Sequence, residues 1–491
     1  MRFTICDLRF AIWGGRSVGR SAVERAIISP ATCIPHKREL AWKLACFAQK
    51  SIAVLVLCLG ATFAGSAEEP LSKPAVGATN INSIDLATAL RLAGAQNLDV
   101  QIARERLAEA KANHSIAVSQ FFPWLSPGVG YRRHEDRLQD VVGNVFDADK
   151  QTYVAGGTLA GQWDFGEALY RALAAKQLAH AAGHALDAQR QESALAAAQG
   201  YFELLLAQAS VGVAEDAVRI SENYLAQVQR AVETGIAFKG DELRVQVQTE
   251  RNRLIQRQSL EQQRFAAARL AQTLHLDPAV ELRGADGEMV PLSLVATNAV
   301  LSTLVQEATV NRPEAKQSQS LIAAAEKSRR GVTYGPWIPA VGAQAFVGGL
   351  GGGRGSGSGN FGASEDYALT LGWRIGPGGL FDSGRKRSAE SRLNVAKLGQ
   401  EKLRDEIVRQ VIEAHTRSLS LADQITIAGR ALKAAERSLQ LAQDRKQFGV
   451  GAVLETIQAE QDLTRARLDY AKAIADFDRA QYALTKAIGK L

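Results

Sequence analysis

Residues 459–487 read AEQDLTRARLDYAKAIADFDRAQYALTKA, and this stretch decides the fold. Alanine recurs every seven residues, at positions 459, 466, 473, 480 and 487. The first four alanines are each followed, four positions later, by a large side chain: Leu463, Tyr470, Phe477 and Leu484. A seven-residue repeat of small and large residues is typical of a helix that packs closely along a partner helix.

The partner helix is expected just upstream, where a second stripe of the same kind lies. Its members are Val411, Ala414, Ser418, Leu421, Ile425, Ala428, Leu432, Ala435, Leu439 and Ala442. Between the two stripes stands FGVG at 448–451, and the glycines Gly449 and Gly451 suit a tight reversal. The pattern predicts that the C-terminal hundred residues form a long antiparallel helical hairpin with a glycine tip.

The positive charge of the chain is concentrated near its N-terminal end. Residues 1–67 contain nine Lys/Arg and three Asp/Glu, which accounts for six of the seven net positive charges of the 491-residue chain. Residues 68–491 are close to neutral, so the composition gives no support for a nucleic-acid partner.

Residues 1–67 also have the pattern of a secretory leader. Lys50 precedes an apolar run over 52–59, and small residues lead up to Ala67. A basic flank, a short apolar core and small residues before a polar stretch predict a signal peptide cut after Ala67. A single membrane anchor is the alternative, although the run is short for a span. Residues 68–83, rich in Pro, Ser and Asn, are expected to be a linker.

All four cysteines lie in this leader, at Cys6, Cys33, Cys46 and Cys58. A mature chain that begins near Glu68 would contain neither a disulfide nor a thiolate metal site. Acylation of Cys58 is a further alternative, but the bulky Leu57 precedes it where a small residue is expected.

From residue 84 onward the chain runs through one pattern twice. The matched segments are Asn97 with Asn311, Pro123-Trp124-Leu125 with Pro336-Trp337-Ile338, Asp164-Phe165-Gly166 with Asp382-Ser383-Gly384, and Gly235-Ile236 with Gly449-Val450. Offsets this constant predict a tandem duplication, with a first structural repeat over 84–294 and a second over 295–491. Each repeat is expected to contain a helix around its Asn, two strands, a long helix, a Gly tip and a returning helix.

The strands are predicted from the alternation of apolar and polar residues. In the second repeat one face carries Tyr367, Leu369, Leu371, Trp373 and Ile375. In the first repeat the corresponding face carries Leu125, Val129 and Tyr131.

Element lengths indicate a membrane setting. A helix from about Gly384 to Gln447 would extend roughly 95 Å, which no compact soluble domain needs. Strands of about a dozen residues reach roughly 40 Å, enough to cover the hydrocarbon thickness of a bilayer when tilted. Because no apolar run beyond the leader is long enough for a spanning helix, a membrane role would require strands in a closed barrel.

Four tryptophans follow the leader, and they occupy equivalent places. Trp124 and Trp337 open the first strand of each pair, whereas Trp163 and Trp373 close the second. In a hairpin all four lie at one level beside the helices, as expected of an aromatic belt at a membrane interface. The alternative is a set of core aromatics in a soluble sheet, which explains their burial but not their shared level.

Four strands cannot close a barrel by themselves. Membrane barrels begin at about eight strands, so several copies of the chain must pool their strands. The predicted fold is therefore mainly α, with duplicated helical hairpins and a membrane β-barrel shared within an oligomer.

Over essentially all of 84–491 the chain resembles the TolC-like outer-membrane efflux proteins. The resemblance rests on the duplication, on LFDSGR at 380–385 before a long helix, and on Gly449 followed by Glu455, Ile457 and Ala459. It implies a homotrimer in the outer membrane of a Gram-negative-type cell, with a 12-stranded β-barrel and an α-barrel tunnel across the periplasm.

The resemblance also implies a passive exit duct for inner-membrane efflux or secretion pumps, docked through a periplasmic adaptor protein. Residues 276–311 would form a mixed belt around the tunnel. The entrance would lie at the helical tips, at Gly235, Gly449 and Gly451, where relatives carry rings of acidic residues. Glu455 and its counterpart Asp241 match that position, and a carboxylate favoured by the helix dipole is the alternative for Glu455. The chain departs from the pattern at Gln458, Lys446 and Gly451, so its closing contacts must differ.

Other functional classes find less support. The Gly-rich run at 350–359 lacks the ending of a phosphate loop, and His180 and His184 lack a third metal ligand. No nucleophile, base and acid group together, so we expect neither an enzyme nor a cofactor. The alternative to the duct is a periplasmic coiled-coil scaffold without a membrane barrel. Which cargo or pump is served does not follow from the sequence.

Overall fold

The structure is a computed structural model that describes residues 81–277, 280–287, 289–296, 299–354, 360–447 and 452–491. They belong to one compact unit, Ala78–Leu491. The expected leader at 1–67, with its four cysteines, lies outside the described residues, as do Gly449 and Gly451.

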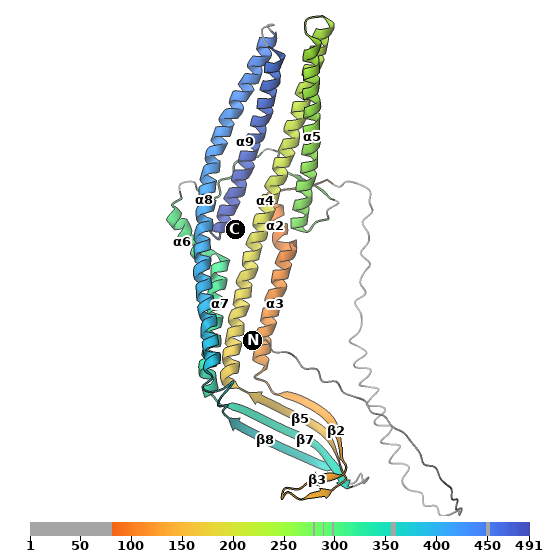
Figure 1. Ribbon diagram of the computed structural model, residues 1–491, viewed down its shortest axis with the longest axis vertical. Coiled ribbons are helices and arrows are strands. Elements are labelled where there is room, and N and C mark those ends of the chain that lie inside the picture. Colours follow the sequence, from red (N-terminus) through yellow and green to blue (C-terminus); the bar gives the residue numbers. More distant parts are fainter. Residues whose placement is uncertain (1–80, 278–279, 288, 297–298, 355–359, 448–451) are drawn as a thin grey trace, which may run out of the picture. The chain divides into compact units, whose positions relative to one another are not determined.

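The first repeat follows the predicted order of elements (Figure 1). Its main elements are α2 (Leu86–Gln96), α3 (Leu98–Ser119), β2 (Trp124–His134), β5 (Lys150–Trp163), α4 (Phe165–Glu233) and α5 (Lys239–Leu274). The loop between β2 and β5 contains two short paired strands that the sequence did not predict, β3 (Arg137–Gln139) and β4 (Val145–Asp147).

The second repeat has the same order. Its elements are α6 (Leu301–Asn311), α7 (Pro313–Tyr334), η1 (Gly335–Trp337), β7 (Ala340–Arg354), β8 (Gly362–Gly372), α8 (Ser383–Gln447) and α9 (Val453–Ala487). None of the helices in the described part of the chain combines the length and apolar character needed to cross a bilayer.

The sequence predicted that Asn97 lies within a helix. It lies instead between α2 and α3. Its side-chain oxygen accepts the backbone N–H groups of Asp99 and Val100, so it caps α3. Asn311 is the last residue of α6, and Pro313 opens α7. Both repeats therefore break their first helix, because a cap or a first-turn proline starts a new helix at that point.

The end of the expected linker is also ordered. Residues 81–84 form β1 (Ile81–Ile84), which pairs in parallel with β6 (Glu281–Gly284). Backbone hydrogen bonding to a strand 200 residues away cannot be seen in a local pattern. This pairing ties the start of the first repeat to the segment that leaves α5.

The predicted C-terminal hairpin is confirmed by the packing of α8 on α9. Ala435, Leu439 and Ala442 of α8 share a buried cluster with Ala459 and Leu463 of α9. The large residues of the repeat are buried as well, with Phe477 at 5% and Leu484 at 2% exposure. Alternating small and large side chains let the two helices approach closely, as the seven-residue repeat required.

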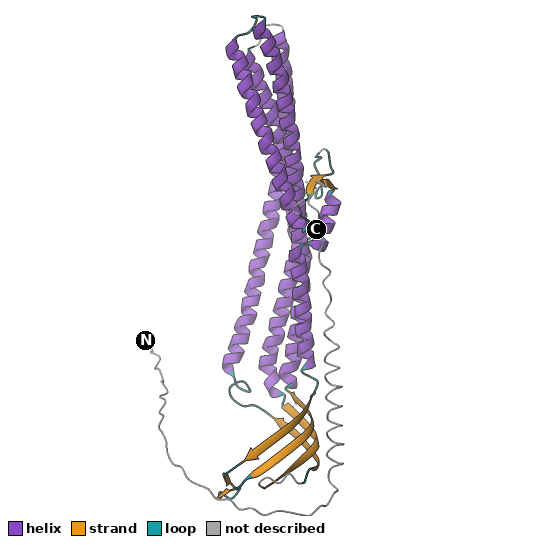
Figure 2. Cartoon of the chain, turned by 90° about the vertical axis from the view of Figure 1, so that its right-hand side faces the viewer, coloured by secondary structure: helices purple, strands orange, loops and turns teal. Residues whose placement is uncertain are grey.

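The long helices form a linear array with two free edges. Helix α5 packs on α4, α4 on α9, and α9 on α8, whereas no α5–α8 contact of comparable extent exists among the described residues. Along the halves of α4 and α8 nearer the sheet, the order of the helices is α3, α4, α7, α8. Figures 1 and 2 show these helices running side by side.

The four long strands form one antiparallel sheet in the order β2-β5-β7-β8. Strands β2 and β8 are its edges, and nearly every residue of both is exposed. The sheet and the helix arrays share one arrangement. The first repeat supplies one edge of each (β2, and α3 or α5), and the second repeat supplies the other (β8, and α8).

Candidate functional site

The tip between α4 and α5 is built around Gly235. This residue has φ of +74°, a conformation that side-chain-bearing residues rarely adopt. The amides of Gly235 and Ile236 donate to the carbonyls of Val232 and Ala231, which closes the end of α4. The predicted first tip is therefore a glycine reversal, and its counterpart at 448–451 lies in a gap between described residues.

Both predicted tip carboxylates lie in the first turn of the returning helix. Asp241 is 3.0 Å from Arg244 on α5, and Glu455 is 2.8 Å from Arg445 on α8. Glu455 is therefore more than a carboxylate at the N-terminus of a helix, since its ion pair joins α9 to α8. Each pair is partly exposed, so we assign it only about 0–1 kcal/mol of stability.

An apolar cluster holds the two hairpins together near the tips. It contains Tyr224 and Val228 of α4, Val245 of α5 and Ile457 of α9. Each side chain is at most 7% exposed. Separating α9 from α4 would expose this cluster to water, at a cost that scales with its apolar area.

Lys446 and Tyr224 add a polar contact between the hairpins. The Lys446 ammonium donates a hydrogen bond to the Tyr224 hydroxyl and lies 3.8 Å from the centroid of its ring. Burial lowers the pKa of Lys446, while Asp241 and Glu460 oppose that shift. Burial also raises the pKa of Tyr224 to about 12, so its hydroxyl stays neutral and can accept from the ammonium.

A chain of amides makes a second link between the hairpins. Gln461 of α9 donates to Gln248 of α5 at 2.7 Å, and Gln248 donates to Asn252 at 3.0 Å. Asn252 in turn donates to the carbonyl of Ala217 on α4 at 3.2 Å. Three helices are thus joined by one polar network, in which Gln248 and Asn252 are buried and therefore need partners within the protein, whereas Gln461 is exposed.

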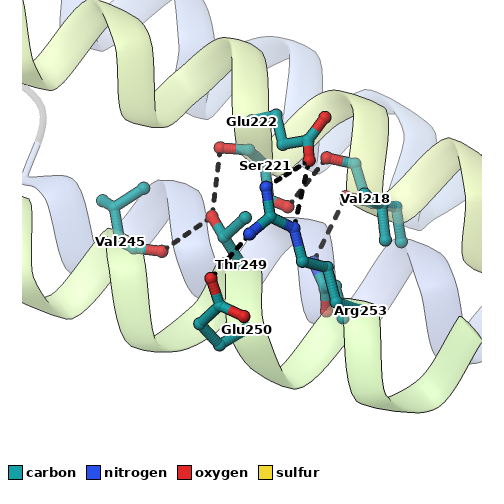
Figure 3. Close-up of polar contacts among 9 residues, drawn as sticks. Val218, Ser221, Glu222, Val245, Thr249, Glu250 and Arg253 are labelled. Carbon is teal, nitrogen blue, oxygen red and sulfur yellow. Dashed lines mark hydrogen bonds and ion pairs between the residues drawn. The ribbon is translucent and has the colours of Figure 1, made fainter. Parts of the chain in front are cut away.

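Polar contacts also join α4 to α5 within the first hairpin (Figure 3). Arg253 donates to Glu222 of α4 at 2.7 Å and to Glu250 of its own helix at 2.7 Å. Thr249 donates to the carbonyls of Val245 and Ser221, at 2.9 and 3.4 Å. These contacts hold the first hairpin as a unit that meets α9.

The sequence alone did not reveal Glu460. This α9 residue is 7% exposed, and burial raises the pKa of its carboxyl to about 7, an effect that Lys446 opposes. Its neighbour Ala459 belongs to the seven-residue repeat and packs on α8, whereas Glu460 faces the first hairpin. The only signal was an acid beside the apolar stripe, which ordinarily indicates a solvated face.

All four tryptophans lie at the end of the sheet nearest the helices. Trp124 begins β2, Trp163 ends β5, and Trp337 and Trp373 flank the β7–β8 pair. The indole N–H of Trp163 donates to Phe121, and that of Trp373 donates to Trp337, at 3.0 and 3.2 Å. Both repeats thus tie the end of a hairpin to the chain that enters it.

The register assigns the sheet one apolar and one polar face. Leu371 pairs with Val341, which pairs with Trp163, whereas Thr370 pairs with Gly342, which pairs with Gln162. A hollow of about 380 Å³ on the apolar face is lined by residues including Leu159, Trp163, Tyr367 and Leu369. One of about 580 Å³ on the other side is lined by residues including Trp124, Gln162, Gln344 and Thr370.

Two details of the strand prediction change. Strand β8 ends at Gly372, so Trp373 and Ile375 lie beyond it, and Ile375 bridges to Leu380. The register also separates two of the tryptophans, because Trp163 shares the apolar face and Trp124 pairs with Ala160 on the polar one. Side chains alternate along each strand, so this assignment follows from the pairing.

Within the described ranges, the structure gives no third ligand to the two histidines considered from the sequence as a metal site. His180 and His184 both lie on α4, and the described residues contain no group of three His, Cys, Asp or Glu that could hold a metal ion.

Comparisons with known proteins agree with this architecture. The family described as "Outer membrane efflux protein" matches residues 89–274 and 304–490. Protein CyaE of Bordetella pertussis is 26% identical over 444 residues, which cover 87% of this chain and 89% of that protein.

Solved structures show the same fold. The CmeC outer membrane channel of Campylobacter jejuni superposes with a TM-score of 0.72 at 14% identity, over 87% of this chain and 94% of that one. The open state of the MtrE outer membrane channel of Neisseria gonorrhoeae gives 0.66 at 16% identity, over 86% and 95%. The prediction of long helices with a smaller set of strands is confirmed.

Proposed function

This chain belongs to the outer membrane efflux protein family, and we propose on that premise that three copies form one passive exit duct for an inner-membrane pump. Membership makes the chain an outer-membrane channel protein of efflux or secretion, not an enzyme. The trimer, the adaptor and the pump are the parts that we propose.

The observation that carries the proposal is the presence of free edges in both the sheet and the helix arrays. Among the described residues, strands β2 and β8 are unpaired on one side, and α3, α5 and α8 are the end helices of the two arrays. An exposed strand edge invites pairing with another strand. One copy's β8 edge can meet the next copy's β2 edge, and such head-to-tail contacts form a ring when the rotation closes.

The strand number is compatible with three copies, the number that the resemblance to TolC-like proteins implies. Three chains supply twelve strands from the four-stranded sheet of each, above the roughly eight at which membrane barrels begin. The polar face with Gln162 and Thr370 would line the lumen, and the apolar face with Leu369 and Leu371 would meet lipid. Trp163 would then contribute to the aromatic belt from the lipid side.

Mass and conductance test the duct. Native mass spectrometry of the detergent-purified protein should give three times the mass of one mature chain, and the purified protein should conduct ions in planar bilayers. A detergent-independent, non-conducting protein would support the alternative, a periplasmic coiled-coil scaffold.

The helical tips would be the periplasmic entrance, where an adaptor docks. Three copies of Glu455 and of Asp241 near a narrow axis would favour cations, because water screens charge poorly in a constriction. The Arg445 pair weakens this field, so Arg445→Ala should raise cation preference and Glu455→Gln should lower it. Bilayer conductance with and without a trivalent cation tests both variants. Identical cation selectivity in the parent protein and the two variants would indicate that the gate lies elsewhere.

A further inference from the structure

A buried acid and a bridging lysine meet where the two hairpins touch. Lys446 of α8 binds Tyr224 of α4 through its ammonium, which is hydrogen-bonded to the hydroxyl and 3.8 Å from the ring centroid. Asp241 of α5 and Glu460 of α9 both act electrostatically on this ammonium. Tyr224, in the other hairpin, is also within the reach of the Glu460 charge.

Glu460 lacks the partners that a buried carboxylate ordinarily needs. It is 7% exposed, and its carboxylate accepts no hydrogen bond from the residues that the structure describes. It lines a cavity of about 360 Å³ between the hairpins, together with Ala217 and Ile220 of α4 and Gln248 of α5. An ionised carboxylate in such a place loses much of its hydration, and the charge of Lys446 compensates only in part, so burial favours the protonated form.

Several other charged residues line the same cavity as this acid. The cavity also contains Arg251 of α5 and Arg465, Arg467 and Asp469 of α9. Arg467 is paired with Asp216 of α4 at 3.3 Å, and Asp241 of α5 acts on Lys446. Among these groups Lys446 is the charge that lowers the pKa of Glu460, against the larger opposite effect of burial.

We propose that Glu460 is a proton switch for the separation of the two hairpins, which on the proposed function is the opening of the duct. Protonated Glu460 stays packed between α9 and the first hairpin. Ionised Glu460 requires water, which it gains when α9 moves away from α4 and α5. It also competes with Tyr224 for the Lys446 ammonium, so both effects favour separation.

The direction of the pH dependence follows from linkage. The pKa of Glu460 is about 7 in the packed arrangement, against 4.5 for a hydrated glutamate. Protons therefore bind the packed arrangement more tightly, and packing loses stability as the pH rises from about 4.5 through 7. The full change in the equilibrium is at most a few hundredfold, since each pKa unit corresponds to a factor of 10.

A distance measurement in the full chain tests the switch. Spin labels are placed at Ala226 of α4 and Gln440 of α8, both exposed, on a background without the native cysteines. We expect the longer-distance population to grow as the pH rises from about 4.5 to 7 in the parent protein and to level off above 7, and this growth to be absent in Glu460→Gln. Lys446→Met should increase that population at every pH, because it removes the contact with Tyr224.

The matched control is Asp462→Asn, an exposed α9 acid two residues from Glu460, which should keep the parent response. A parent protein without pH response, or the same response in Glu460→Gln, would overturn the switch. Bilayer conductance separates the two proposals. Conduction with a pH profile unchanged in Glu460→Gln contradicts only the switch, whereas a pH-dependent distance in a protein that never conducts contradicts only the duct.

Discussion

Arg385 Nη2 lies 3.0 Å from Oε1 of Glu167 and joins the first turn of α8 to the first turn of α4. These turns are equivalent in the two repeats, and each is capped by an aspartate, Asp164 or Asp382. Arg385 also donates to the carbonyl of Gly378 at 3.0 Å. The arginine of the LFDSGR segment therefore fixes the two long helices to each other where they leave the sheet.

Arg385→Ala should destabilise this junction by roughly 1–2 kcal/mol, because it removes charge-assisted hydrogen bonds from partly buried partners. Thermal unfolding of the purified protein measures the loss. Arg387→Ala, an exposed change two residues along α8, is the control and should have little effect. Equal stability of the two variants would show that the Glu167 contact does not hold the helices.

Ala473→Leu should weaken the α8–α9 hairpin by roughly 1–3 kcal/mol, because the alanine is 8% exposed and a larger side chain overpacks the contact. Ala434→Leu makes the same chemical change at an exposed position of α8. Unfolding midpoints in denaturant compare the variants. An equal loss in both would mean that side-chain size at 473 does not set the helix spacing.

Leu371→Arg should reduce the yield and heat stability of the proposed trimer, by roughly 2–4 kcal/mol if the site lies near the middle of the bilayer. The adjacent Thr370→Arg places the same charge on the polar face and should be tolerated, because that face would contact water. Gel mobility of the unheated protein after detergent extraction reports both. Tolerance of Leu371→Arg with loss in Thr370→Arg would reverse the assignment of the two faces.

Asp478 should make the fold less stable at alkaline pH. Burial raises the pKa of its carboxyl to about 7, against the opposing hydrogen bond from the Leu292 amide at 2.7 Å. A raised pKa stabilises the fold below the unfolded value of 3.8, and this contribution is lost as the pH rises through 7.

Asp478→Asn keeps an acceptor for Leu292 and should remove part of this pH dependence, roughly 1–2 kcal/mol between pH 5 and 8 after allowance for residual hydration. Denaturant unfolding at several pH values measures the slope. Asp476→Asn, whose parent side chain is paired with Arg479, is the control and should leave the slope unchanged. A slope retained in Asp478→Asn would assign the effect to other acids.

The sequence determined the repeated local structure of this protein, because that structure follows from periodicity. The seven-residue spacing of Ala459 to Ala487 required a close helical partner, and the stripe that ends at Ala442 supplied it. Alternation around Leu369 and Leu371 required a two-faced strand, and the constant offsets fixed the order of elements in both repeats.

Only the tertiary structure decided which hairpins and strands meet. Lys446 and Tyr224 are 222 residues apart, and β1 pairs with a strand two hundred residues further along. Helix α4 has neighbours on several sides, so no single apolar stripe identifies its contact with α9. Glu460 is buried for the same reason. Its environment depends on where the first hairpin lies, and a charge pattern read along one helix carries no information about a neighbour that packs from the side.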